Sequence, residues 1–309
     1  MIGVRPNEPT TEWRCPTIMR ALEPEVVDAV WAAVEPYLPG PSRTQPLGCH
    51  RSRTSDRLVL GLMLVRLVTR SSWVTTERLC ANTVSATTAR ARRDEWVEAG
   101  VFDKIAEEAI CADDKIIGLD LEEVAVDDSM HKAPGGGEGT GLNPTDRGRT
   151  GWKWSIATDF GGIPVGWATD GANRHDQKLL GATLDAVARR GLLWDVGTLH
   201  LDRGDDADTV RTSLVTTYKL DDVVIARKRP AGSAKVKRPV PLGLRWPVER
   251  TNAWLANFGQ LRRNTDRKTN HRLAQFALAL VALIAAELID LRDRWCPASR
   301  LSAQALRLL

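Results

Sequence analysis

The stretch WSIATDFGGIPVGWA at residues 154–168 decides the fold class, because it holds two short apolar runs separated by the pair Gly161-Gly162. Short apolar runs on either side of a glycine pair are typical of two strands joined by a hairpin turn. Another apolar run precedes them at residues 119–126, and two more follow at residues 197–201 and 223–226, each next to a helical pattern. Three strands in hairpin order, followed by alternating helix and strand, predict a mixed α/β sheet.

The part of the chain before this sheet has the apolar spacing of helices. Residues 25–35 and 58–68 predict two helices, and residues 75–80 and 86–98 predict a pair joined by a tight turn. We therefore expect a helical domain over residues 1–112 and a mixed-sheet domain over residues 113–309. The helix pair is compatible with a DNA-reading helix-turn-helix, with Arg90, Arg92 and Arg93 on its second helix. A solvated basic helix in an all-helical domain is an equal alternative.

Composition excludes several classes of protein. The chain has 309 residues, 43% of them hydrophobic, and a net charge of +4, unlike a peptide, a collagen or a disordered tail. Its five cysteines are scattered without C-x-x-C pairs, and its N-terminus lacks the apolar core of a signal peptide, so we expect a cytoplasmic location. Within the apolar stretch 273–291, the uncharged run 276–286 is too short to span a membrane and is flanked by Gln275, Glu287 and Asp290, which predicts a core helix and no membrane association.

Positive charge is concentrated late in the chain. Residues 227–268 contain twelve lysines or arginines and two acidic residues, Glu249 and Asp266. Such a run is the electrostatic footprint of a surface that binds nucleic-acid phosphates, with a solvated basic loop as the alternative.

Three carboxylates stand at the ends of predicted elements. Asp127 ends the first predicted strand, Asp202 ends the fourth, and Glu249 lies in the first turn of a helix that Pro247 opens. Taken one at a time, such residues are more often helix caps or solvated charges than ligands. Together they supply the hard oxygen ligands that Mg²⁺ or Mn²⁺ requires, and two such ions support phosphodiester chemistry.

The sequence around all three carboxylates resembles the IS4/IS5-type insertion-sequence transposases, a branch of the DDE family. The matching motifs are VDDSMHKA (126–133), NPTDRGRTGWKWSIATDFGGIPVGWATDGANRHD (143–176), LHLDRGDDAD (199–208) and RWPVERTNAWL (245–255). The resemblance implies that Asp127, Asp202 and Glu249 are the catalytic metal ligands, with Arg245 in the family's R-x-x-x-E signature. Four positions differ from the family pattern. Asp128 stands where a glycine is usual and Asp205 where a tyrosine is usual, and Leu242 and Ala256 stand where many relatives carry tyrosine and lysine.

The resemblance also implies an RNase H-like catalytic domain and a reaction on DNA. We expect hydrolysis that exposes a 3′-OH at each end of an insertion sequence, followed by attack of that hydroxyl on target DNA. The expected cofactors are two Mg²⁺ or Mn²⁺ ions, and the expected partners are the terminal inverted repeats, target DNA and a second copy of the chain. The residues expected to bind DNA are Arg90, Arg92, Arg93, Lys235, Lys237, Arg245, Arg250, Arg262 and Arg263. A catalytically inactive DNA-binding derivative and an RNase H-like nuclease remain alternatives.

Overall fold

A computed structural model describes residues 18–40, 53–225 and 244–295. Its α-helices are α1 (Pro24–Val34), α2 (Asp56–Thr69), α3 (Trp73–Leu79), α4 (Ala86–Glu98), α5 (Val101–Ile116), α6 (Asp176–Arg189), α7 (Asp208–Thr216), α8 (Trp246–Asn257), α9 (Gly259–Arg262) and α10 (Thr269–Trp295). Its strands are β1 (Glu123–Lys132), β2 (Gly141–Leu142), β3 (Thr150–Thr158), β4 (Pro164–Gly171), β5 (Thr198–Leu201) and β6 (Val223–Ile225). Short 3₁₀ turns are η1 (Ile18–Leu22), η2 (Glu35–Tyr37), η3 (Leu193–Asp195) and η4 (Arg203–Asp205).

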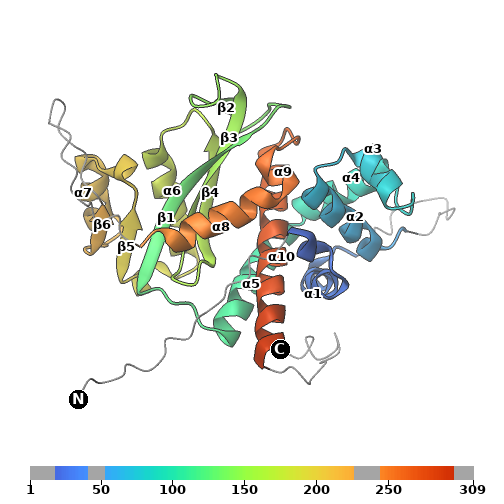
Figure 1. The fold of residues 1–309 in the computed structure, drawn as a ribbon, viewed down its shortest axis with the longest axis horizontal. Helices are drawn as coiled ribbons and strands as arrows, with labels where there is room; N and C mark the ends of the chain where they lie inside the picture. Colours follow the sequence, from blue (N-terminus) through green and yellow to red (C-terminus); the bar gives the residue numbers. More distant parts are fainter. Residues whose placement is uncertain (1–17, 41–52, 226–243, 296–309) are drawn as a thin grey trace, which may run out of the picture.

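The predicted mixed sheet is confirmed. Strand β3 pairs antiparallel with β1 on one side and with β4 on the other, where the short β2 also joins it. Strand β5 runs parallel to β1, and β6 runs parallel to β5. The order along the sheet is therefore β4-β3-β1-β5-β6, with β1 in the middle. Parallel neighbours need crossover connections, which α6 and α7 supply (Figure 1).

Strand β1 is longer than its apolar run indicates, and the expectation that it ends at Asp127 is wrong. Its ladder with β3 continues through the pairs Asp127↔Ile156 and Lys132↔Gly151. In this extension His131 is buried and stacks on Trp154, with ring centroids 3.7 Å apart. Backbone pairing and this aromatic contact keep polar residues extended where hydrophobicity alone marks no strand.

Each face of the sheet has its own hydrophobic core. Along β1, Val124 and Val126 join a cluster with α6 and α7, whereas Ala125 points to a cluster with α8 and α10. This alternation follows from the two-residue period of a strand. Asp127 is two residues beyond Ala125 and therefore emerges on the face that α8 crosses (Figure 1).

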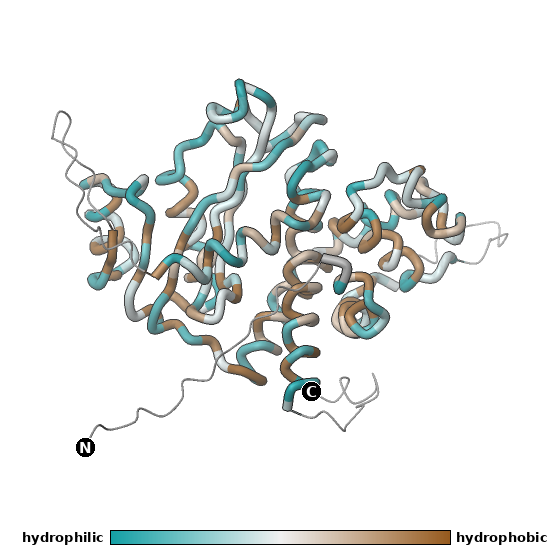
Figure 2. The backbone as a smooth tube through the Cα atoms, in the orientation of Figure 1, coloured by the Kyte–Doolittle hydropathy of each residue, from teal (hydrophilic) through white to brown (hydrophobic). Residues whose placement is uncertain are grey.

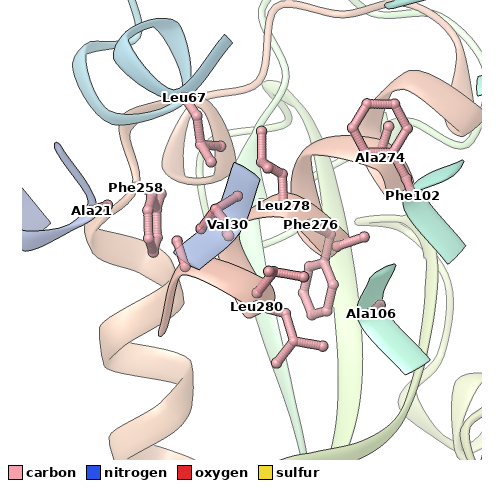
Figure 3. Packing of buried hydrophobic residues seen from close by; sticks show 14 of the residues in the cluster. Ala21, Val30, Leu67, Phe102, Ala106, Phe258, Ala274, Phe276, Leu278 and Leu280 are labelled. Atoms are coloured by element: carbon pink, nitrogen blue, oxygen red, sulfur yellow. The ribbon is translucent and has the colours of Figure 1, made fainter. Parts of the chain in front are cut away.

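Helix α10 is the centre of the larger core, standing between the sheet and helices α1–α4 (Figure 1). Phe276 of this helix contacts the sheet, with its ring 5.6 Å from that of Trp154, whereas Leu278 lies in the same cluster beside Val30 of α1 (Figure 3). Figure 2 shows hydrophobic residues along α10, with hydrophilic ones at the outer edges of the molecule. By length and composition α10 is the one described helix that could span a membrane, yet 67% of its apolar window is buried inside the protein. That burial agrees with the predicted core helix.

The expected division at residues 112/113 falls inside α5. Asp113 lies in this helix and is buried, so no linker separates the two parts at that point. The hydrophobic cluster around α10 also includes residues of α1, α2, α4 and α5. The N-terminal helices thus share their core with the C-terminal end of the chain.

A buried ion cluster adds a polar link across the same junction. The carboxylate of Asp266, just before α10, accepts hydrogen bonds from Arg66 of α2 at 3.3 Å and from Arg93 of α4 at 3.2 Å. It also accepts one from Gln275 of α10. Arg92 is buried too and pairs with Asp56. These contacts disagree with the expectation that Arg92 and Arg93 face DNA, and at these two positions α4 is not the solvated basic helix of the alternative either.

We predict that Asp266→Ala lowers the free energy of unfolding by about 3–5 kcal/mol, because it removes the carboxylate that pairs with buried Arg66 and one of the two that pair with Arg93. Urea unfolding followed by circular dichroism measures this loss. Asp293→Ala removes an exposed carboxylate that pairs with Arg292, and should cost less than about 1 kcal/mol. Equal losses in the two variants would contradict the role of Asp266.

Three acidic side chains influence one another where α5, α10 and the turn between β3 and β4 meet. Burial raises the pKa of Asp113 to about 7, of Glu287 to about 7 and of Asp159 to about 6. The mutual charges of Asp113, Asp159 and Glu287 act in the same direction. A carboxyl whose pKa is raised by folding weakens the folded state once it ionises, so its stabilising contribution is lost as pH rises through the folded-state pKa.

We therefore predict that Glu287→Gln raises the melting temperature at pH 8 but not at pH 5. The variant removes a charge that folding disfavours, a gain of about 1 kcal/mol above the folded-state pKa. Scanning fluorimetry at both pH values tests this, with the exposed Glu98→Gln as the matched control. A gain of the same size at both pH values would contradict the charge argument.

Candidate active site

Three elements bring the predicted carboxylates together. Asp127 lies in β1 on the face toward α8, and Asp202 follows β5, the parallel neighbour of β1. The Asp202 side chain accepts a hydrogen bond from the backbone N–H of Gly204 at 3.3 Å, which fixes the start of η4. Glu249 lies in the first turn of α8, which begins near β1 and β5 (Figure 1).

The guanidinium of Arg245 lies among these carboxylates. Its Nη1 donates to Asp202 Oδ1 at 2.8 Å, and its Nη2 donates to Asp127 Oδ1 at 2.6 Å. The same Nη2 is 3.5 Å from Glu249 Oε1, one helical turn further along the chain. Residues far apart in the sequence thus converge on one cation.

Asp127 is the most enclosed of the three. Burial raises its pKa, while the charge and hydrogen bond of Arg245 and a hydrogen bond from Asn252 act against this rise. Asn252 Nδ2 donates to Asp127 Oδ2 at 2.9 Å, and Asn252 Oδ1 accepts from Trp154 Nε1 at 2.8 Å. The sequence motifs do not single out Asn252, although its place one turn after Glu249 on the same helix is a signal that could identify it.

The donor set fits a hard divalent cation. It consists of carboxylate oxygens alone, which suits Mg²⁺ or Mn²⁺, and all three oxygens already point at one positive charge. Within residues 18–40, 53–225 and 244–295, no three acidic, histidine or cysteine side chains are spaced to hold a metal ion. The three carboxylates of the candidate site are instead arranged around the guanidinium of Arg245.

A second charged group lies behind the site, on the opposite face of β1. The Asp128 carboxylate is 3.4 Å from Lys153 Nζ, and Lys153 also pairs with Asp176 at the start of α6. Burial raises the pKa of Asp128 to about 7, although the charge of Lys153 opposes the rise. Asp128, the unusual residue of its motif, therefore belongs to a buried ion pair and faces away from Asp127.

The other residues expected to bind DNA differ in their exposure to solvent. Arg90, Arg262 and Arg263 are exposed, whereas Lys235 and Lys237 lie outside the described residues. Arg250 donates to the carbonyl of Gly161, and its guanidinium lies over the rings of both Trp246 and Trp254. It is half-buried and turned toward the body of the protein.

Two family models match this chain. The model described as "Transposase DDE domain" matches residues 118–285, more than half of the chain, and "Putative transposase of IS4/5 family" matches residues 26–106. The chain belongs to the IS4/IS5 family of DDE transposases. The DDE domain implies an RNase H-like fold, with which the observed strand order agrees. DDE transposases generally use divalent metal ions, and their partner is DNA.

Two curated proteins of Burkholderia cepacia are similar to this transposase-family chain. The "Putative transposase for insertion sequence element IS402" is 37% identical over 136 residues, which cover 42% of this chain and 61% of that protein. The "Insertion element IS402 uncharacterized 16.2 kDa protein" is 30% identical over 124 residues, 40% of this chain and 82% of that protein. The chain thus spans about three-fifths of the first relative's length. No solved structure matches it.

We predict that Asn252→Ala in this DDE transposase lowers stability more at pH 7 than at pH 4. The variant removes a hydrogen bond that favours ionised Asp127, so the folded-state pKa of Asp127 rises and its ionisation costs more above that pKa. Losing both hydrogen bonds should cost about 2 kcal/mol at pH 7. Thermal melts at the two pH values measure the difference, and the exposed Asn257→Ala on the same helix is the control. A loss independent of pH would contradict the link to Asp127.

Proposed function

We propose that this chain is a DNA transposase that cleaves the ends of its insertion sequence and joins the exposed 3′-OH to target DNA, with Asp127, Asp202 and Glu249 as the catalytic metal ligands. The observation that carries the proposal is the convergence of these three carboxylates, from β1, the end of β5 and α8, on one cationic position. Membership of the DDE transposases supports the same assignment.

The three carboxylates are proposed to hold two Mg²⁺ or Mn²⁺ ions, which when bound activate the attacking oxygen and stabilise the leaving one. The protein's own part is to place its groups. Asn252 orients the Asp127 carboxylate through its bond to Trp154, and the Gly204 N–H orients Asp202. Water is the nucleophile in the first step and the released 3′-hydroxyl in the second, so one site serves both reactions.

Exposed cations on α4 and beyond the C-terminal end of α8 are proposed to bind the DNA backbone. Arg262 and Arg263 follow α8 and are exposed, and Arg90 is exposed on α4. Trp246 is 44% exposed next to Arg245 and has the ring of Phe160 6.1 Å away, an aromatic surface suited to unpaired bases. Binding through such contacts weakens steeply as salt concentration rises.

The proposal also covers the location, the oligomeric state and the domain division of the chain. We propose that the chain acts in the cytoplasm as a homodimer, because two element ends must be held together while both are cut. We also propose two domains with a shared core, which meet at α5. The two family models support this division, since they end and begin on either side of residues 107–117.

Cleavage of the DNA that flanks the reading frame tests the proposal. We expect purified wild-type protein with Mg²⁺ to cut this DNA and to form joined products. Asp127→Asn, Asp202→Asn and Glu249→Gln should each lose more activity than the roughly 10–100-fold typical of an outer-shell partner of a metal site. Gel analysis of end-labelled DNA measures both steps.

Asp208→Asn is the matched control, because Asp208 is an exposed carboxylate six residues after Asp202. It should keep wild-type activity. Cleavage without joined products would favour the nuclease alternative. DNA binding without cleavage would favour the inactive derivative, and undiminished cleavage by Asp202→Asn would refute the assigned site.

A further inference from the structure

The position of Arg245 excludes a metal ion from the carboxylates that are proposed to bind it. Its two terminal nitrogens occupy Oδ1 of Asp127 and Oδ1 of Asp202 at 2.6 and 2.8 Å. The other oxygen of each carboxylate is also engaged, by Asn252 and by the Gly204 N–H. Mg²⁺ binds oxygen ligands at about 2.0–2.1 Å. An ion bound to these oxygens would lie close to the positively charged guanidinium and repel it, so the ion and Arg245 compete for the same oxygens.

The contacts of Arg245 are uneven in strength, which makes its release feasible. Its partners Asp202 and Glu249 have side chains that are 48% and 57% exposed, and ion pairs with such groups contribute little. Only Asp127, at 19%, is substantially enclosed. Arg245 Nε is buried and has no hydrogen-bond partner among the described residues. The contacts of the two terminal nitrogens therefore hold the guanidinium in place.

A DNA phosphate offers the guanidinium an equivalent partner. Arginine binds phosphate and carboxylate with the same two-pronged geometry, and both are anionic. Arg245 precedes α8, and exposed Arg262 and Arg263 lie just beyond the other end of this helix, at the margin proposed to meet DNA. A backbone that reaches the site would bring phosphates to Arg245 while its carboxylates gain a metal ion.

We propose that Arg245 is an internal counter-ion that couples metal binding to DNA binding. Without DNA it neutralises Asp127, Asp202 and Glu249 and keeps their affinity for divalent ions low. When DNA binds, Arg245 moves to a phosphate and frees the carboxylates. This inference rests on the proposed function, since it takes the three carboxylates as metal ligands.

Reciprocity gives the proposal a quantitative form. If DNA strengthens metal binding by some factor, the metal must strengthen DNA binding by the same factor, and couplings of this kind are typically 5–150-fold. Removing Arg245 should abolish the coupling. It should also leave the DNA-free protein with the high metal affinity that the wild type shows only on DNA.

Binding of Mn²⁺, followed by electron paramagnetic resonance of the free ion, tests this without relying on activity. The full-length protein is titrated alone and with a short duplex of arbitrary sequence at low salt. For the wild type we expect the Mn²⁺ Kd to fall at least about fivefold on addition of DNA. For Arg245→Ala we expect a low Kd in both cases, and for Asp127→Asn a loss of binding in both.

Arg262→Ala is the matched control, because it removes an exposed arginine beyond the other end of α8 that contacts none of the three carboxylates in the described structure. It should weaken DNA binding and leave the DNA-free Mn²⁺ affinity unchanged. Arg245→Gln removes the charge but keeps a polar side chain, and it serves the same test if Arg245→Ala does not fold by circular dichroism.

The outcomes separate the inference from the function on which it rests. Wild-type protein that binds no Mn²⁺ with or without DNA would overturn the metal-dependent function. Wild-type binding that is lost in Asp127→Asn, but is equal with and without DNA and no tighter in the Arg245 variants, would overturn the counter-ion role alone. Mn²⁺ binding that survives Asp127→Asn would place the ion elsewhere and overturn the inference as well.

Discussion

Burial of α10 is the constraint on which the rest of the structure depends. This helix of 27 residues supplies a continuous apolar surface to the sheet on one side and to the N-terminal helices on the other. Neither neighbour has another described element of comparable length to cover that surface. The hydrophobic effect therefore joins the beginning and the end of the chain around one helix, and Asp266 adds its buried ion pairs at the same junction.

The candidate site follows from the geometry of the sheet that α10 supports. The two-residue period of β1 sends Asp127 toward α8 and Asp128 toward Lys153, so adjacent carboxylates enter different environments. One meets a guanidinium at the surface of the domain, and the other is neutralised by a lysine in the interior. A shift of one residue in the pairing of β1 with β3 would turn each of them to the opposite face of the sheet.

Much of this arrangement could be predicted from sequence, because local patterns carry it. The strands β3 and β4 and the helix α8 follow from apolar runs, the glycine pair and Pro247, and the family motifs single out the three carboxylates. The contacts of Arg245 with Asp127 and Asp202 could not be predicted, since they join positions 118 and 43 residues apart. The same holds for Arg93, whose acidic partner Asp266 lies 173 residues away. Sequence alone does not distinguish a basic helix whose arginines pair with distant carboxylates from a basic helix whose arginines face DNA.

The late position of α10 also matters for how the polypeptide is made. Residues 269–295 leave the ribosome after every other described element, so helices α1, α2, α4 and α5 have uncovered apolar faces until α10 has been synthesised. A frameshift or stop codon anywhere before α10 would produce a chain whose N-terminal helices have no core. Truncated copies of the gene should therefore yield aggregation-prone fragments that are removed by proteolysis, and no folded N-terminal domain able to compete for DNA.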